Sequence, residues 1–503
     1  MRKINFGACI CTLGAIAALA ACEKDKPATP QTEEYVWKTD GGLKACDHIL
    51  FTDGKEDPDG KEIGNGDQEF VFYGKQTLAK GTYLLKGWVY VADGAQLTIE
   101  PGTVIKGDKD TKASLIVERG GKLIAQGEQG APIVFTSEAE AGSRKPGDWG
   151  GVILCGKAAN NKGEMQIEGG PRSKHGGDSN SDNSGVLSYV RIEFAGYPFQ
   201  TDKEINGLTL GSVGSGTKLD HIQVSYSNDD SFEWFGGCPD AKYIIAYKGW
   251  DDDFDTDNGF SGKVQYALSV RDSRIADVSQ SNGFESDNNA DGSATSPYTT
   301  ATFSNVTFVG PKLDAQFQND PSYINGGELY PNNGSALGKF QSAMQIRRNS
   351  RLNCINSFAL GFPIGLILDN QKGDTQGAAE KGELKLQNIW FAGMDVTGSD
   401  ANKSYEDVLV TGYDEKSKPI YDKTKKSFSS TFFLKQNGNK ALESWADLVA
   451  ANGYMPLSGS ALLSAASFDG ADSWFDKVNY IGAFGTEDWT AGWTEFEPEN
   501  AKY

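Results

Sequence analysis

Acidic side chains gather in one stretch of this sequence. Asp229 and Asp230 follow an apolar segment, and Glu233 comes soon after them. A denser group lies one segment further along the chain and comprises Asp251, Asp252, Asp253, Asp255 and Asp257, with Glu285, Asp287 and Asp291 beyond it. Carboxylates held close together repel one another unless they share protons or a cation. Hard oxygen ligands in turns suit Ca²⁺, which takes six to eight of them.

The sequence therefore predicts a calcium site, whose ligands we expect to be Asp229, Asp230, Asp251, Asp252, Asp253, Asp255 and Asp257. The competing interpretation is a set of Asp-rich turns whose side chains accept hydrogen bonds from backbone N–H groups and face water. The EF-hand pattern is absent, because the glycine and the closing glutamate do not stand at the required offsets.

Aromatic residues occupy the same stretch, namely Phe232, Trp234, Phe235, Trp250, Phe254 and Phe260. Exposed indole rings beside carboxylates can bind sugars, since the ring contacts C–H groups while the acid bonds hydroxyls. We expect Trp234, Trp250 and Glu233 to form a ligand-binding surface of this kind. The alternative places both indoles in an internal aromatic stack, where Phe232 and Phe254 are expected to lie.

Catalytic signatures are not found in the sequence. It has Asp-Asp doublets but neither G-H-G nor R-I-K, and its three histidines, His48, His175 and His221, lie outside the acidic stretch. Arg271, Arg274, Arg347 and Arg348 could be sought as lyase bases, but their local sequences match no such motif. We therefore predict no catalytic residues and favour binding over catalysis.

The elements that must position these side chains are short apolar strands broken by Gly, Asn and Asp. Segments such as Leu97–Ile99, Leu115–Val117, Ile133–Phe135 and Val152–Leu154 recur near every 18 residues, and later segments at offsets of 22 and 23. Strands of this length and period, without helices between them, are typical of a β-solenoid. With an offset of 22, Asp229 and Asp230 should lie beside Asp251 and Asp252 on neighbouring coils, about 4.8 Å apart.

Several motifs carry a more specific resemblance. They are "VADGAQLTIEPGTVIKGD" (91–108), "LIVERGGKLIAQGEQGAPIVFTSE" (115–138), "GDWGGVILCGKA" (147–158), "SNDDSFEWFGG" (227–237), "GWDDDFDTDNGFSGKVQ" (249–265) and "VNYIGAFGTEDWTAGWTEF" (478–496). Together they resemble a family of right-handed parallel β-helix lipoproteins of Bacteroidetes. The resemblance implies an all-β fold and an outer-membrane setting, but no established activity.

The amino terminus predicts a lipid anchor. Arg2 and Lys3 precede an apolar run from Ile4 to Ala18, and Leu19-Ala-Ala-Cys22 resembles a bacterial lipobox. Cys22 would carry diacylglycerol and acyl chains such as palmitate after cleavage, and the protein would face the cell exterior from the outer membrane. The alternative is an ordinary secretory signal.

The expected organisation has five parts: a signal peptide (1–21), a lipidated tether (22–45), a small N-terminal cap (46–87), the right-handed β-helix (88–402) and a mixed C-terminal capping region (403–503). Within the last part, Leu442, Trp445, Ala446 and Val449 follow the i, i+3, i+4, i+7 pattern of an amphipathic helix.

The composition excludes one class of function. The net charge of −20 and the lack of a basic stripe argue against nucleic-acid binding. Cys46, Cys155, Cys238 and Cys354 form no C-x-x-C pair, so isolated buried thiols are expected, with one long-range disulfide as the alternative.

We predict a non-catalytic surface lipoprotein that binds a glycan, a peptide or an outer-membrane importer. A calcium-dependent polysaccharide lyase or glycosidase is the second hypothesis, and a structural or adhesive spike is the third.

Overall fold

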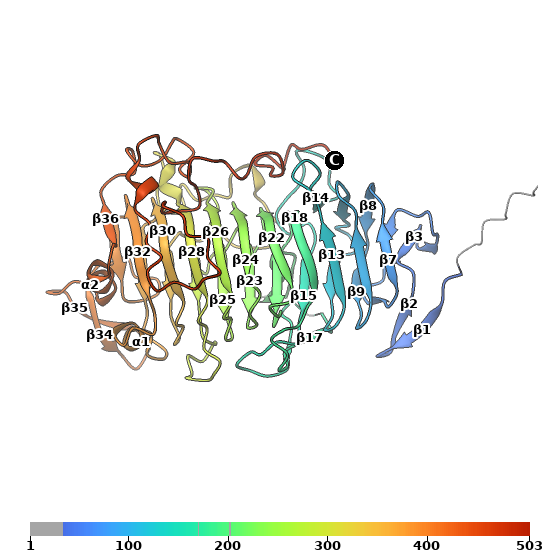
Figure 1. The fold of residues 1–503 in the computed structure, drawn as a ribbon, viewed down its shortest axis with the longest axis horizontal. Coiled ribbons are helices and arrows are strands. Elements are labelled where there is room, and N and C mark those ends of the chain that lie inside the picture. Colours follow the sequence, from blue (N-terminus) through green and yellow to red (C-terminus); the bar gives the residue numbers. More distant parts are fainter. Residues whose placement is uncertain (1–33, 170, 201–202) are drawn as a thin grey trace, which may run out of the picture. The chain divides into compact units, whose positions relative to one another are not determined.

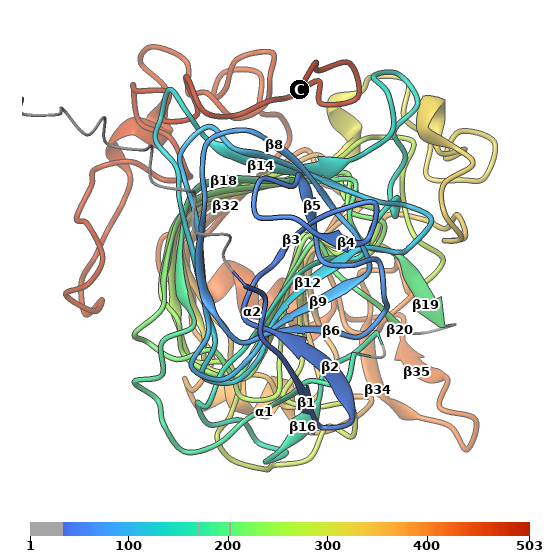
Figure 2. The ribbon, with the colours of Figure 1, turned by 90° about the vertical axis from the view of Figure 1, so that its right-hand side faces the viewer.

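Parallel strands stack coil upon coil in the computed structural model, which describes residues 34–169, 171–200 and 203–503 (Figure 1). The predicted lipidation site, Cys22, lies outside the described residues. Most strands pair in parallel with their counterparts one coil away. The view along the stack shows the coils superimposed as a closed outline (Figure 2). This arrangement confirms the predicted all-β parallel β-helix.

Two sheets line the stack. The first sheet has 13 strands: β1 (Trp37–Asp40), β2 (Leu43–Cys46), β6 (Phe70–Phe72), β9 (Trp88–Val91), β12 (Ser114–Val117), β15 (Gly151–Cys155), β21 (Leu208–Gly211), β23 (Phe232–Phe235), β25 (Phe254–Asp257), β27 (Phe284–Ser286), β29 (Ser342–Ile346), β31 (Ile364–Leu368) and β33 (Val396–Ser399).

The second sheet has 17 strands: β3 (Leu50–Thr52), β4 (Lys55–Glu56), β5 (Glu62–Ile63), β7 (Lys75–Leu78), β8 (Thr82–Leu85), β10 (Gln96–Ile99), β11 (Val104–Gly107), β13 (Lys122–Gln126), β14 (Ile133–Ser137), β18 (Gly185–Glu193), β22 (Lys218–Ser225), β24 (Ala241–Tyr247), β26 (Lys263–Val270), β28 (Thr302–Val309), β30 (Asn353–Leu360), β32 (Leu386–Ala392) and β36 (Lys440–Leu442).

Smaller elements lie outside these sheets. They are the strand pairs β16 (Met165–Gln166) with β17 (Lys174–His175), β19 (Pro198–Gln200) with β20 (Lys203–Glu204), and β34 (Leu409–Tyr413) with β35 (Pro419–Asp422), together with η1 (Pro311–Leu313), η2 (Gly327–Leu329), α1 (Thr375–Glu380), α2 (Phe428–Lys435) and η3 (Ala461–Ser464). Among the described residues, no helix is both long and apolar enough to cross a membrane.

The second sheet bends sharply within each coil. Early coils use two separate strands, and β18 pairs with both β13 and β14, so later coils merge them into one bent strand. The residues at the bend, called bend residues below, have φ angles between 50° and 63°: Tyr189, His221, Tyr243, Tyr266, Asn305, Asn356 and Asn388. Asparagine tolerates this left-handed conformation better than most residues. The first four rings stack with centroids 4.2, 4.5 and 4.8 Å apart.

Strand alternation forms the core. In β23, Phe232 and Trp234 point into the coil, while Glu233 between them points outward. Because neighbouring coils are in register, Phe232 packs on Phe254, which packs on Phe284. The result is one continuous apolar interior that no single coil could bury alone.

Parallel stacking begins before the expected boundary at Trp88. β6 pairs with β9, and β7 and β8 pair with β10 and β11. The segment expected to be an N-terminal cap therefore contributes a full coil, and the antiparallel contacts of β3 with β4 and β5 lie ahead of it. Short polar strands such as Lys75–Leu78 carry too weak an apolar pattern to reveal a coil.

The carboxyl-terminal residues do more than cover the far end. After β36, the chain runs back over the outside of the second sheet (Figure 1). Asn388 donates to the carbonyl of Ala465 (2.7 Å), Gln223 donates to that of Glu495 (2.6 Å), and the Tyr503 hydroxyl bonds the Glu193 carboxylate on β18 (2.8 Å). We call residues 443–503 the tail.

The amphipathic helix predicted at Leu442–Val449 is wrong. Leu442 ends β36, and turns follow it. Leu448 and Val449 are instead buried in a cluster on the outside of the second sheet, with Val309 and Trp390. The apolar spacing thus reflects packing of irregular chain on a sheet. The helix of this region is α2, which covers the first sheet near β31 and β33.

The four described cysteines are free thiols, and Cys46, Cys155 and Cys354 are buried. The expectation of isolated thiols is confirmed within the described residues, with Cys238 partly exposed.

Candidate functional site: a carboxylate cluster on the first sheet

Three carboxylates form a row on the outside of the first sheet. Glu233 of β23 lies opposite Asp255 of β25, which lies opposite Glu285 of β27. In each strand a phenylalanine comes immediately before the acid and points into the core, so the pleat of the strand directs the acid outward. We call Glu233, Asp255 and Glu285 the acidic row.

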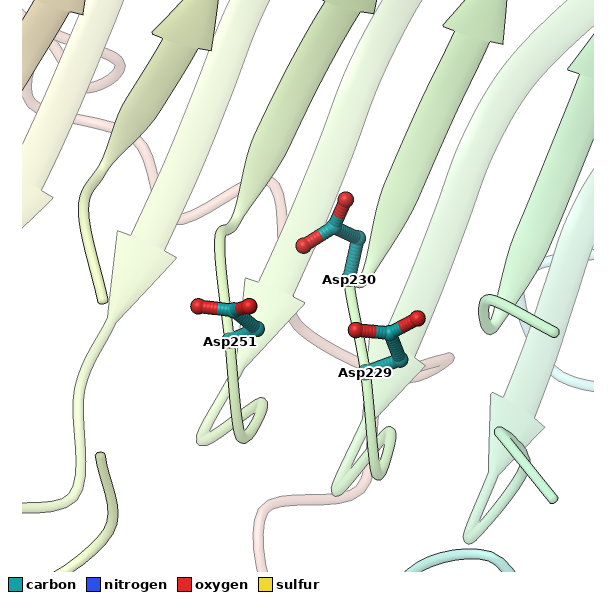
Figure 3. Close-up of side chains that lie close together, drawn as sticks. All are labelled: Asp229, Asp230 and Asp251. Atoms are coloured by element: carbon teal, nitrogen blue, oxygen red, sulfur yellow. The ribbon is translucent and has the colours of Figure 1, made fainter. Parts of the chain in front are cut away.

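Further carboxylates come from the turns that lead into these strands. Figure 3 shows Asp229 and Asp230 on one coil and Asp251 on the next. Carboxylate oxygens of these three residues lie within 4.8 Å of one another. The predicted 22-residue register is confirmed, because Phe232 pairs with Phe254. A second group within the same distance joins Asp230 to the acidic row through Glu233 and Asp255.

Some of these acids also accept hydrogen bonds from backbone N–H groups, as the competing interpretation expected. The N–H of Asp252 donates to Oδ1 of Asp230 (2.8 Å), and the N–H of Asn282 donates to Oδ1 of Asp252. Asn282 continues the series by accepting from the N–H of Ser342 (3.1 Å). One oxygen of Asp230 and one of Asp252 therefore join successive coils.

Asp253 lies apart from the cluster. Its side chain is fully buried and forms an ion pair with Arg271, with Nη1 and Oδ1 2.9 Å apart. Ser269 donates to its second oxygen. Both oxygens are occupied, so the structure does not bring Asp253 to the predicted metal ligands. The physical reason is position, since Asp253 lies in the turn before β25, where the alternation of the strand does not fix the direction of its side chain, and it pairs there with the buried Arg271.

Burial and mutual repulsion dominate the electrostatics. Desolvation, followed by the charges of neighbouring acids, raises the pKa of Asp230, Glu233 and Asp255 well above the usual range. Burial and the neighbouring Asp287 raise the pKa of Asp257 to about 7. The cluster therefore favours protons or a cation.

Two arginines neutralise only one edge of the cluster. Arg347 bonds both Glu285 and Asp287, and Nη1 of Arg348 lies 2.5 Å from Oδ2 of Asp287. Away from that edge, Oδ1 of Asp251 and Oδ1 of Asp255 are buried without a hydrogen-bond partner among the described residues. A buried, unpaired carboxylate oxygen is costly unless a proton or a cation contacts it.

The rings of Trp234 and Trp250 are buried, contrary to the expectation that they form an exposed ligand-binding surface. Trp234 is 1% exposed and stacks between Phe232 and Phe260 inside the coil. Trp250 has no exposed surface and lies beside Tyr330. Neither offers a ring face to a ligand. Of the three expected ligand-binding residues, only Glu233 belongs to the cluster.

Sequence reasoning did not assign roles to Glu285, Asp287 and Arg347, which the structure adds to this site. A signal was present: Phe232-Glu233, Phe254-Asp255 and Phe284-Glu285 repeat the same pair on three coils. A loop inserted before Phe284 lengthens the interval and hides the repeat.

Neither a curated protein nor a solved structure gives a significant match to the chain. A family model does match, described as "Pectate-lyase like beta helix domain", over residues 72–448. The match covers more than half of the chain, includes every carboxylate of the cluster and supports a right-handed β-helix. The chain therefore belongs to the pectate-lyase-like β-helix domain family.

Proposed function

We propose that the protein is a non-catalytic, calcium-dependent binding protein, and that its ligand is a polysaccharide held through the carboxylate cluster. The observation that carries the proposal is the pair of buried, unpartnered oxygens on Asp251 and Asp255, each in or beside a group of converging carboxylates. Ca²⁺ takes six to eight oxygens, so a few carboxylates leave positions for hydroxyls or carboxylates of a ligand. A peptide or an outer-membrane importer remains the alternative partner.

Calcium binding is tested with Glu233→Gln/Asp255→Asn. We expect the wild-type protein to bind Ca²⁺ in isothermal titration calorimetry and the double variant to bind about tenfold more weakly or not at all, since two charged ligands are lost. The matched control is Glu100→Gln/Asp110→Asn, which removes two exposed acids outside the cluster. Equal calcium affinity in the wild type and the cluster variant would contradict the proposal.

The geometry does not favour a lyase. Proton abstraction by an arginine requires its neutral form within reach of the substrate. Arg347 instead bonds Glu285 and Asp287, and these two acids raise its pKa. Arg347 is thus held in its charged form, and the neighbouring Arg348 is also paired with Asp287.

Hydrolysis is the second candidate, and the raised pKa values of Glu233 and Asp255 favour it. An acid that keeps its proton near neutral pH can protonate a leaving group, while a neighbouring carboxylate acts as base or nucleophile. A reducing-end assay on pectate, xylan and glucan distinguishes the candidates. Sugar release that disappears in Asp255→Asn favours the hydrolase, and binding without release favours the non-catalytic protein.

We also propose that Cys22 anchors the protein in the outer membrane through lipid. The support is the lipobox-like sequence Leu19–Cys22 after a short apolar run. We expect Cys22→Ser to lose incorporation of labelled palmitate and to leave the membrane fraction, because each buried CH₂ contributes about 0.8 kcal/mol to membrane affinity. Membrane retention of an unlabelled Ser variant would show that another contact holds the protein.

A further inference from the structure

A cleft of about 590 Å³ lies between the second sheet and the tail, separate from the carboxylate cluster. Its floor is the outer face of the last coils, from Lys263 of β26 to Gly438 just before β36. The tail segment 467–475 forms the wall that faces this floor. This segment is held at the cleft because the N–H of Ser467, at its start, donates to Asn356 and the N–H of Asp476, just after its end, donates to Gln265 on the sheet.

The floor consists of regular rows. Lys263 pairs with Thr302, which pairs with Asn353, and Lys385 follows on the next coil. A parallel row places Ile355 beside Gln387. Because neighbouring strands lie about 4.8 Å apart, the floor from β26 to β36 spans about 20 Å. The cleft therefore suits an extended, repeating ligand more than a compact one.

Unused hydrogen-bonding groups face this space. Among the described residues, the side chains of Thr302, Gln387 and Asn437 make no hydrogen bond within the protein, although each lines the cleft. Hydroxyl and amide groups both donate and accept, which matches the hydroxyls of a sugar. Ile355, beside Gln387, adds an apolar side chain to the same lining.

The formal charges at the cleft balance. Lys263 and Lys385 contribute two positive charges, and Asp469 and Asp472 contribute two negative charges. Lys263 is already paired with Asp240, with the two charged atoms 3.3 Å apart. An anionic chain would thus meet more repulsion than attraction, and an uncharged chain would meet neither.

We propose that this cleft is a second binding site, which takes a neutral oligosaccharide and needs no calcium. A peptide is less suited, since β26, β28, β30 and β32 are each paired on both sides and offer no edge for strand addition. The site is independent of the function proposed for the carboxylate cluster.

The experiment uses the full chain in EDTA with four neutral hexasaccharides: maltohexaose, cellohexaose, xylohexaose and mannohexaose. We expect at least one to bind in isothermal titration calorimetry, and Thr302→Ala/Gln387→Ala to weaken that binding about tenfold. The matched control is Thr98→Ala/Lys122→Ala, which alters half-buried outward positions on β10 and β13 of the same sheet.

The outcomes separate the two sites. Glu233→Gln/Asp255→Asn should leave hexasaccharide binding unchanged, whereas it should weaken calcium binding about tenfold or abolish it. The proposal is overturned if none of the four sugars binds, if the Thr302/Gln387 variant binds as well as the control, or if binding requires calcium. Preferential binding of hexagalacturonate would also overturn it, because the ligand would then be anionic.

Discussion

In calcium-free buffer, the free energy of unfolding should fall as the pH rises from about 4 to about 8. Asp257 shows the direction of this pH dependence, because its pKa in the folded protein is about 7, against 3.8 for the ordinary group. The folded state therefore binds this proton more tightly than the unfolded state does. The resulting stability is complete below the unfolded pKa and is lost as the pH rises through about 7.

Asp230, Glu233 and Asp255 act in the same direction, because their pKa values are also raised. The total loss should be a few kcal/mol, since a displacement of one pKa unit corresponds to about 1.4 kcal/mol. Urea denaturation at a series of pH values, with EDTA or with millimolar Ca²⁺, measures it. Calcium should restore most of the lost stability at neutral pH, because a ligand that binds only the folded state stabilises it.

Asp257→Asn and Asp255→Asn should flatten the pH dependence in EDTA, since an amide does not titrate. A stability that rises with pH in EDTA would show that the cluster is stabilised as carboxylates without a cation. A pH dependence that is the same with and without Ca²⁺ would mean that the cluster holds protons and not calcium.

Replacing Arg271 should destabilise the protein by about 3–5 kcal/mol. Its guanidinium is fully buried against Asp253, and it also donates to the carbonyls of Asp251 (2.6 Å) and Trp250 (3.3 Å). Arg271→Ala leaves a buried carboxylate without its cation and two carbonyls without a donor. Chemical denaturation at neutral pH gives the change.

The matched control is Arg274→Ala, which removes an exposed arginine three residues away and should cost less than about 1 kcal/mol. Arg271→Ala/Asp253→Ala should recover part of the loss, because the unpaired charge is removed as well. A single variant as stable as the control would show that water reaches this ion pair.

The solenoid and its register could be predicted because they depend on local repetition. Strands of similar length recur at nearly constant offsets, and the offset of 22 places Asp229 beside Asp251. Each coil needs the same apolar pattern to stack on its neighbour, so this pattern is repeated many times along the sequence.

The direction of each side chain in the cluster was harder to predict. In a strand, a shift of one residue exchanges the inner and the outer face. Trp234 and Glu233 were expected to share a surface, yet neighbours in a strand must face opposite ways. Alternation counted from the core residues Phe232 and Phe254 places Glu233, Trp234 and Asp255 correctly. It does not place Asp253, which lies before β25 and is buried in its ion pair with Arg271.

The course of the tail was not predictable from the sequence. Several of its partners are far away in the sequence, since Gln223 and Glu495 are 272 residues apart and Glu193 and Tyr503 are 310 residues apart. Such contacts leave no periodic signal in either segment. The tail covers the stacked rings of the bend residues, where Trp493 packs on Tyr189 and His221.

This late cover affects the order of events during folding. Each coil can stack on the one before it as soon as it is available, because its partners precede it in the chain. The end of the tail must instead close loops of about 300 residues, so its docking is expected to be the last and slowest step. Until the tail docks, the bend residues are expected to be accessible to solvent and proteases. A chain that ends before Trp493 would keep these residues exposed, and this exposure would distinguish it from the complete chain.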